Sequence, residues 1–216
     1  MFELISKGGI LMVPLIVCSI IAVAIFIERF QNLKRTRIDS RKFMEQLRED
    51  LGKGNANLAI FTCEKTKGPL ANVLLAGLKA SHLGKVEMES AMKEAGFEEI
   101  PAIEKHVSIL ATIANISPLL GLLGTVTGMI RAFSVIQQKG IGQAAELAGG
   151  ISQALITTAT GLTIAIPALV MYNMISSKID AQISEIERCS LELINILYHS
   201  EDSQGYRDRV ASGRKA

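Results

Sequence analysis

The stretch "SPLLGLLGTVTGMI", residues 117–130, decides the fold because it carries no charge and is apolar enough for a lipid bilayer. Three glycines, two threonines, a serine and a proline stand among its leucines. A simple membrane anchor needs only bulky apolar residues. The small and hydroxyl residues therefore indicate a second task, either close helix contact or the lining of a shared interior.

This stretch lies in one of three long blocks, residues 8–27, 107–130 and 147–177, that contain no Asp, Glu, Lys, Arg or His. Each block reaches or exceeds the roughly 20 residues that a helix needs to cross a bilayer. Three such blocks in 216 residues favour transmembrane helices over the buried helices of a soluble core. The first block is followed by "ERFQNLKR" and no small-residue cleavage site, which favours a retained span over a signal peptide. We expect an all-α integral membrane protein whose second and third spans extend into a helical cytoplasmic region.

Basic residues set the expected orientation. Fourteen Lys or Arg lie between Glu28 and His106, only Arg131 and Lys139 lie between spans two and three, and six follow span three. The N-terminus should therefore lie outside and the C-terminus in the cytoplasm. The predicted order is an outer N-terminal end and first span (1–30), a cytoplasmic helical region (31–106), the second span (107–130), an outer loop (131–146), the third span (147–177), and a cytoplasmic C-terminal helix and tail (178–216).

The cytoplasmic region is predicted to form helices broken at 52–55, 67–69 and 82–84, where Gly and Pro cluster. Pro101 should bend or break the helix that leads into span two. After span three, apolar residues recur at helical spacing along one face, which needs a partner in this chain or in a neighbouring copy. These residues are Ile179, Ile183, Ile186, Leu193 and Leu197.

Both later spans carry a small, weakly polar face when they are drawn at about 100° per residue. In span two that face holds Ala114, Ser117, Gly121, Thr125 and Gly128, with Gly124 beside it. In span three it holds Gly150, Ala154, Thr157, Thr158, Gly161, Ala165 and Ala168, and we add Pro167 to the predicted helix-packing residues. Two interpretations stay open here. The faces either pack tightly on each other, or both line a pore or a groove for another helix.

Several function classes fit poorly. The spans hold no charged group, so this chain alone cannot build a carboxylate proton relay within the bilayer, and a titrating group would come from a partner. No catalytic residues, metal site or cofactor site is expected, because no Gly-rich phosphate loop or Cys/His cluster occurs and all three histidines lie outside the spans. Cys18, Cys63 and Cys189 show no metal spacing and are not expected to form a disulfide. The basic cluster at 29–42 is mainly a topology signal that adds only a weak affinity for anionic lipid, and nothing indicates nucleic acid.

Three motifs resemble the MotA/TolQ/ExbB proton-channel family, and its ExbB/TolQ branch most. They are "KGGILMVPLIVCSIIAVAIFIERF" at the start, "ISPLLGLLGTVTGMIRAF" at 116–133 and "GGISQALITTATGLTIAIPALVMYN" at 149–173. The resemblance covers all three spans in order. It implies a homopentamer in the bacterial inner membrane, with the N-terminus and the loop 131–146 in the periplasm, whose spans two and three line a central pore. That pore would hold a dimer of ExbD- or TolR-like single-span proteins, each with an essential aspartate. Proton flow would then deliver work to a TonB- or TolA-like protein.

By position in these motifs, Thr125 and Thr158 match the pore threonines of the family, with Thr127 and Thr157 as assisting neighbours. Ser117 and Gln153 complete the predicted proton pathway. Many relatives have a glutamate where this chain has Gln153, and an amide can hydrogen-bond but cannot exchange a proton. The alternatives are a flagellar or gliding stator subunit, and a membrane scaffold that assembles a complex without conducting ions.

Overall fold

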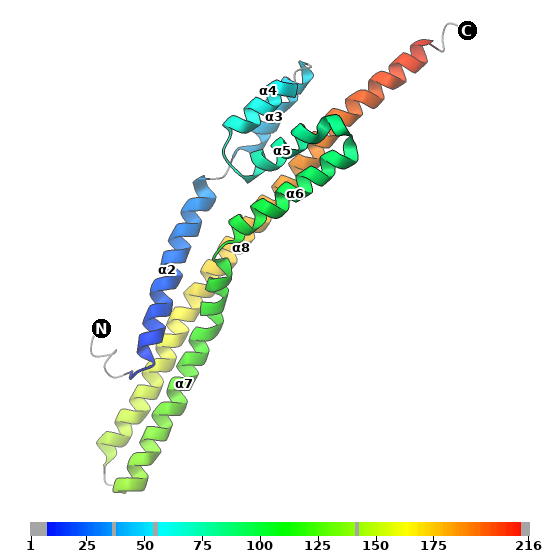
Figure 1. The fold of residues 1–216 in the computed structure, drawn as a ribbon. Coiled ribbons are helices and arrows are strands. Elements are labelled where there is room, and N and C mark those ends of the chain that lie inside the picture. The colour runs from blue at the N-terminus through cyan, green and yellow to red at the C-terminus, as the bar shows by residue number, and fades with distance from the viewer. Residues whose placement is uncertain (1–7, 36–37, 54–55, 141–142, 213–216) are drawn as a thin grey trace. The chain divides into compact units, whose positions relative to one another are not determined.

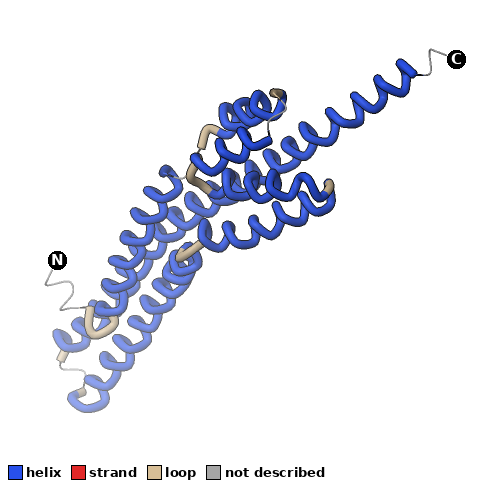
Figure 2. Tube along the Cα trace, turned by 45° about the horizontal axis from the view of Figure 1, so that its top comes forward, coloured by secondary structure: helices blue, strands red, loops and turns tan. Residues whose placement is uncertain are grey.

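The computed structural model describes residues 8–35, 38–53, 56–140 and 143–212, and within these ranges every regular element is a helix (Figures 1 and 2). The elements are α2 (Met12–Arg35), α3 (Ser40–Gly52), α4 (Ala56–Lys65), α5 (Pro69–Ala80), η1 (Ser81–Leu83), α6 (Lys85–Glu104), α7 (Val107–Lys139) and α8 (Ala144–Ser212). This confirms the predicted all-α class. Three of these helices are long and apolar enough to cross a membrane, and their candidate spans are Met12–Leu33, Val107–Lys139 and Ala144–Tyr198.

The chain divides into two compact units. We call Met1–Gln31 with His106–Ser177 the membrane unit, because it contains the three uncharged blocks. We call Asn32–Lys105 with Lys178–Ala216 the charged unit. The long helix α8 contributes its first part to the membrane unit and its second part to the charged unit.

Local sequence explains where the helices of the charged unit begin and end. Asp39 caps α3, because its side chain accepts a hydrogen bond from the backbone N–H of Lys42 at 3.4 Å. Pro69 occupies the first turn of α5, where its missing N–H costs nothing. Helix α6 continues through Pro101 to Glu104, so the predicted break of the helix does not lie at this proline. The break lies at His106, whose left-handed backbone (φ 63°) separates α6 from α7.

Large apolar side chains from α3, α4, α5, α6 and α8 form the core of the charged unit. Leu47, Leu74, Met88 and Leu193 are all fully buried in it. The apolar face predicted after span three therefore has its partner largely within this chain. Cys63 is buried in the same core, and this burial raises the pKa of its thiol to about 12.

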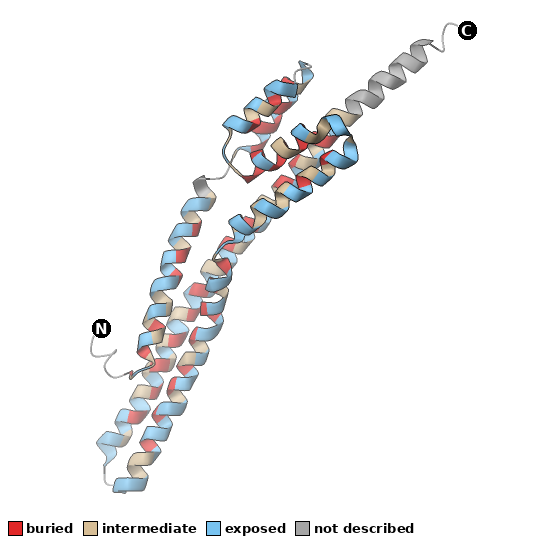
Figure 3. Cartoon of the chain, in the orientation of Figure 1, coloured by how far each residue is buried: buried red, intermediate tan, exposed pale blue. Residues whose placement is uncertain are grey.

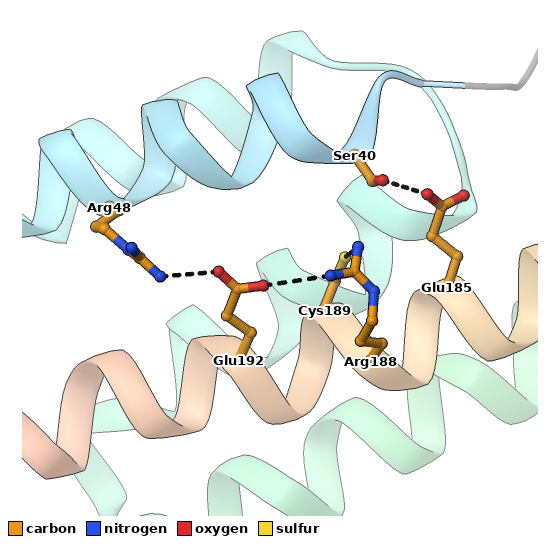
Figure 4. Close-up of polar contacts among 6 residues, drawn as sticks. All are labelled: Ser40, Arg48, Glu185, Arg188, Cys189 and Glu192. Atoms are coloured by element: carbon orange, nitrogen blue, oxygen red, sulfur yellow. Dashed lines mark hydrogen bonds and ion pairs between the residues drawn. The ribbon is translucent and has the colours of Figure 1, made fainter.

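Polar contacts join α3 to α8 at the surface of this core (Figure 4). Ser40 donates a hydrogen bond to Glu185, and Arg48 Nη2 donates to Glu192 Oε1 at 2.9 Å. Arg188 Nη1 also lies 3.8 Å from Glu192 Oε2. These contacts fix α3 along α8 while the apolar side chains pack beneath them.

Candidate functional site

The small faces of α7 and α8 pack directly against each other within one chain. A Cβ atom added to Gly161 would lie 2.6 Å from the carbonyl oxygen of Ser117, and one added to Gly121 would lie 3.1 Å from Thr158 Cα. Real Cβ atoms do not approach backbone as closely as 2.6 Å, so Gly161 requires glycine, whereas a Cβ on Gly121 would be a tight contact that its neighbour must yield to. The two backbones are in contact here, as small residues permit in lipid.

The same contact continues toward the turn between the two helices. A Cβ on Gly128 would lie 2.8 Å from Ala154 Cβ, and one on Gly150 would lie 2.9 Å from the carbonyl oxygen of Gly128. Gly124 faces the side chain of Thr157. The buried positions in Figure 3 recur along both helices, as these contacts require.

Hydroxyl groups contribute one bond across this interface. Thr158 Oγ1 donates to the carbonyl oxygen of Gly121 on α7 at 3.0 Å. Thr157 is fully buried and donates to the carbonyl of Gln153 on its own helix at 2.8 Å. Ser117 is fully buried too, and donates to its own helix at Ile113 at 2.7 Å. Ser117 and Thr157 thus lie inside the helix pair, out of reach of any further helix.

Thr125 and Thr127 lie on different faces of α7. Thr125 is half-buried and donates to the carbonyl of Leu122 at 2.7 Å, whereas Thr127 is exposed and donates to that of Leu123 at 3.0 Å. At about 100° per residue the two side chains point about 160° apart. The structure therefore does not bring Thr127 together with Thr125.

Helical geometry places Thr125 and Thr158 on one edge of the antiparallel α7–α8 pair. On a helical wheel each threonine lies about 60° from the centre of its helix's packing face, in the same rotational direction. Because the two helices face each other and run in opposite directions, both threonines then lie on the same side of the pair. Gly121 faces Thr158, so Thr125 lies about one helical turn, roughly 6 Å, further along the pair. Thr125 also lines a shallow hollow with Val126 and Met129. We call this side the threonine edge.

Gln153 lies on the opposite edge of the α7–α8 pair, next to the turn that precedes α2. Its side-chain amide lies next to Gly9, whose positive φ (74°) favours glycine. Its amide oxygen accepts a hydrogen bond from Arg131 Nη1 at 3.2 Å. Gln153 therefore connects α7, α8 and the turn before α2, and α2 lies along the helix pair in both views (Figures 1 and 2).

The predicted site residues thus separate into groups. Most predicted packing residues are buried between α7 and α8; these are Ala114, Gly121, Gly124, Gly128, Ala154, Gly161 and Ala165. Pro167 is exposed and lies off this face. Sequence reasoning missed Arg131 and Gly9 as partners of Gln153. It also missed Ala132, a small residue at the correct helical spacing just beyond the predicted end of span two.

The threonine edge can bind a hydrogen-bonding group but cannot itself exchange a proton at neutral pH. Each hydroxyl hydrogen is directed at a backbone carbonyl, which leaves oxygen lone pairs able to accept a hydrogen bond. No Asp, Glu, Lys, Arg or His occurs in residues 107–130 or 147–177. Any proton carrier at this edge must therefore be supplied by water or by another chain.

Comparison with known proteins gives consistent matches. The MotA/TolQ/ExbB proton channel family matches residues 65–188. The chain is 30% identical to the biopolymer transport protein ExbB-like 3 of Synechocystis sp., over 91% of this chain and 96% of that protein. It is 34% identical to the Tol-Pal system protein TolQ of Haemophilus influenzae, over 80% of each. It is 31% identical to the biopolymer transport protein ExbB of Salmonella typhimurium, over 78% of this chain and 72% of that protein.

Proposed function

We propose, on the premise that this chain belongs to the MotA/TolQ/ExbB proton channel family, that it is the multi-copy membrane subunit of a proton-driven motor. The motor would serve biopolymer transport or Tol-Pal-type work, as the names of its relatives indicate. The proposed location is the bacterial inner membrane, with the charged unit on the cytoplasmic side, because the basic residues concentrate there.

One observation carries this proposal. The threonine edge is the uncharged side of the α7–α8 pair that lies opposite the edge occupied by the turn before α2. Thr125 and Thr158 there present hydroxyl oxygens among bulky apolar side chains. Such an edge suits a foreign helix that carries one polar group into the membrane, because it offers hydrogen bonds without a competing charge.

The partner we propose is a dimer of a single-span protein of the ExbD or TolR kind, with one aspartate in each membrane helix. Five copies of the present chain would surround it, each turning its threonine edge inward. A TonB- or TolA-like protein would receive the work. The copy numbers and the aspartate rest on the resemblance to the family. The uncharged spans support only the aspartate, because a titrating group must come from another chain.

The hydroxyls would distinguish the two protonation states of that carboxyl group. In the present rotamers the hydroxyl hydrogens of Thr125 and Thr158 are bonded to backbone carbonyls. Their oxygens can therefore accept a hydrogen bond from the O–H of a neutral carboxylic acid. A rotated hydroxyl would donate to the ionised carboxylate. Each copy could therefore receive a neutral carboxyl group and retain it briefly after ionisation, which is the behaviour that a proton-driven rotary step needs.

The experiment is co-expression with a single-span protein of the ExbD or TolR kind from the same genome, followed by native mass spectrometry and a proton-flux assay in liposomes. Five copies of this chain with two of the partner are expected. Thr125→Val should keep that assembly and reduce flux at least tenfold. The matched control is Thr163→Val, because Thr163 is exposed and bonds only its own helix, at the carbonyl of Ala159. Full flux in Thr125→Val would refute the role of the threonine edge.

A non-conducting scaffold is the second candidate function. The observation in its favour is that most small residues of α7 and α8 are consumed by packing within one chain, so they do not need a pore to explain them. A scaffold would assemble with its partner and show no flux above that of empty liposomes, with or without Thr125.

A further inference from the structure

An apolar groove lies between α6 and α8 in the charged unit. It has a volume of about 450 Å³ and is lined by Ile100 of α6 and Ile183 of α8, together with Met92, which is itself buried in the core. Phe97 and Leu191 also line it, although 78% and 63% of these residues is exposed. Large apolar side chains gathered on a charged, water-facing unit mark a surface that binds another molecule.

Acidic side chains surround this α6–α8 groove. Glu89, Glu99 and Glu187 line it, against a single lysine, Lys93. Helix α6 as a whole holds six glutamates and two lysines. The occupant should therefore present an apolar side chain together with positive charge.

Helix α4 of the same unit has a surface of this kind. Leu58 and Phe61 are one turn apart and exposed, and Lys65 Nζ lies 4.4 Å from the centre of the Phe61 ring. Lys67 lies two residues beyond Lys65, the last residue of α4. The one acidic residue of α4, Glu64, is paired with Lys79 Nζ at 2.9 Å. We call Leu58, Phe61 and Lys65 the α4 knob.

We propose that the α4 knob of one copy enters the α6–α8 groove of the next copy. This inference rests on the multi-copy assembly proposed above and names the surfaces through which neighbouring copies meet outside the membrane. The knob and the groove are different surfaces of one unit, since α4 packs on α3 and α5 whereas the groove is formed mainly by α6 and α8. Such a head-to-tail contact repeats from copy to copy and closes into a ring when the rotation permits.

The chemistry of the two surfaces is complementary. An aromatic ring at the centre of a contact, surrounded by charged groups, is the usual arrangement of an energetically important interface residue. Phe61 would lie on Ile100 and Leu191, and Lys65 would lie among the glutamates of the rim. The positive charges of Lys65 and Lys67 would repel those of a second knob, which disfavours a symmetric knob-to-knob contact.

Disulfide cross-linking of the full chain in native membranes tests the contact. Asn57→Cys combined with Leu191→Cys should give a ladder of covalent oligomers on a non-reducing gel, because Asn57 is exposed one turn before Phe61 and its replacement leaves the knob intact, whereas each single substitution should give monomer only. A ladder from Asn57→Cys alone would overturn the proposal in favour of a symmetric contact. Absence of the ladder in a protein that native mass spectrometry still finds oligomeric would overturn it and leave the proposed function intact. A chain that never forms oligomers would refute both.

Charge reversal supplies a second readout. Lys65→Glu should lower the yield of the ladder at least threefold, and Glu187→Lys in the same chain should restore it. Lys53→Glu is the control, since Lys53 is an exposed lysine outside the knob. A ladder insensitive to these changes would overturn the charge complementarity. If Leu191→Cys is shielded from a water-soluble maleimide although no ladder forms, the groove has another occupant, a lipid or a different protein, and the proposal fails.

Discussion

The α7–α8 interface and the core of the charged unit are both buried helix contacts, but they are built from opposite kinds of residue. Glycine, alanine, serine and threonine fill the first, and backbone touches backbone at Gly121 and Gly161. Leucine and methionine fill the second, where Leu47, Leu74 and Met88 are fully buried. One helix, α8, takes part in both contacts and changes its buried residues from small to large as it passes from one unit to the other.

This difference shows how the surroundings select residues. In water, large apolar side chains stabilise a core because their burial removes apolar area from solvent. In lipid that gain is absent, since the acyl chains are as apolar as leucine, and helices associate through close van der Waals contact. Buried small residues therefore mark the helix contacts of the membrane unit, and buried large apolar residues mark those of the charged unit.

The largest effect should come from emptying the core of the charged unit. Leu193→Ala removes a fully buried side chain and should lower the free energy of unfolding by about 2–5 kcal/mol, through lost transfer energy and the cavity that remains. Leu83→Ala is the matched control, because Leu83 is an exposed leucine in the same unit. Urea unfolding followed by circular dichroism measures both. Equal effects in the two variants would mean that the charged unit does not depend on this core.

The second effect should come from filling the membrane interface. Gly161→Leu forces a side chain against the carbonyl of Ser117 and should cost about 3 kcal/mol, at the upper end of typical overpacking. Gly149→Leu is its control on the same helix, because an added Cβ there meets no atom within 4 Å. Thermal unfolding in mild detergent distinguishes them. If both variants were equally stable, α7 and α8 would not be in contact at this level.

Much of this architecture was predictable from sequence. The length of the uncharged blocks predicted three spans, and helical spacing predicted that Gly121 and Gly161 belong to a special face. Helical spacing alone did not show what each face contacts, because a helical wheel describes one helix and not the helix that packs against it. The choice between packing and lining required the register of α7 against α8. Thr157 and Thr158 are adjacent in sequence, and only that register shows that one is sealed and the other lies at an edge.

The remaining features depend on contacts between segments distant in sequence. Gln153 was predicted from the resemblance alone, and its partners Arg131 and Gly9 are 22 and 144 positions away (153 − 131 and 153 − 9). The α6–α8 groove likewise joins residues about 90 positions apart, such as Met92 and Ile183 (183 − 92 = 91). The helix breaks near 53, 66 and 84 were easier to predict because glycine and proline determine them locally.

The smallest effect on stability should come from the hydrogen bond that the Thr158 hydroxyl makes between α8 and α7. It also tests most sharply the contrast between the α7–α8 interface and the core of the charged unit. Thr158→Val removes the bond from Thr158 Oγ1 to the carbonyl of Gly121 and should cost about 0.6 kcal/mol in stability. Thr125→Val is the matched control, since its hydroxyl bonds only its own helix and its removal should change stability by less than about 0.5 kcal/mol. Unfolding by titration with a denaturing detergent measures the free energy of unfolding of both variants. A loss in Thr158→Val as large as that in Leu193→Ala would mean that polar contacts hold the membrane unit together, and the contrast between close packing in lipid and apolar burial in water would then fail.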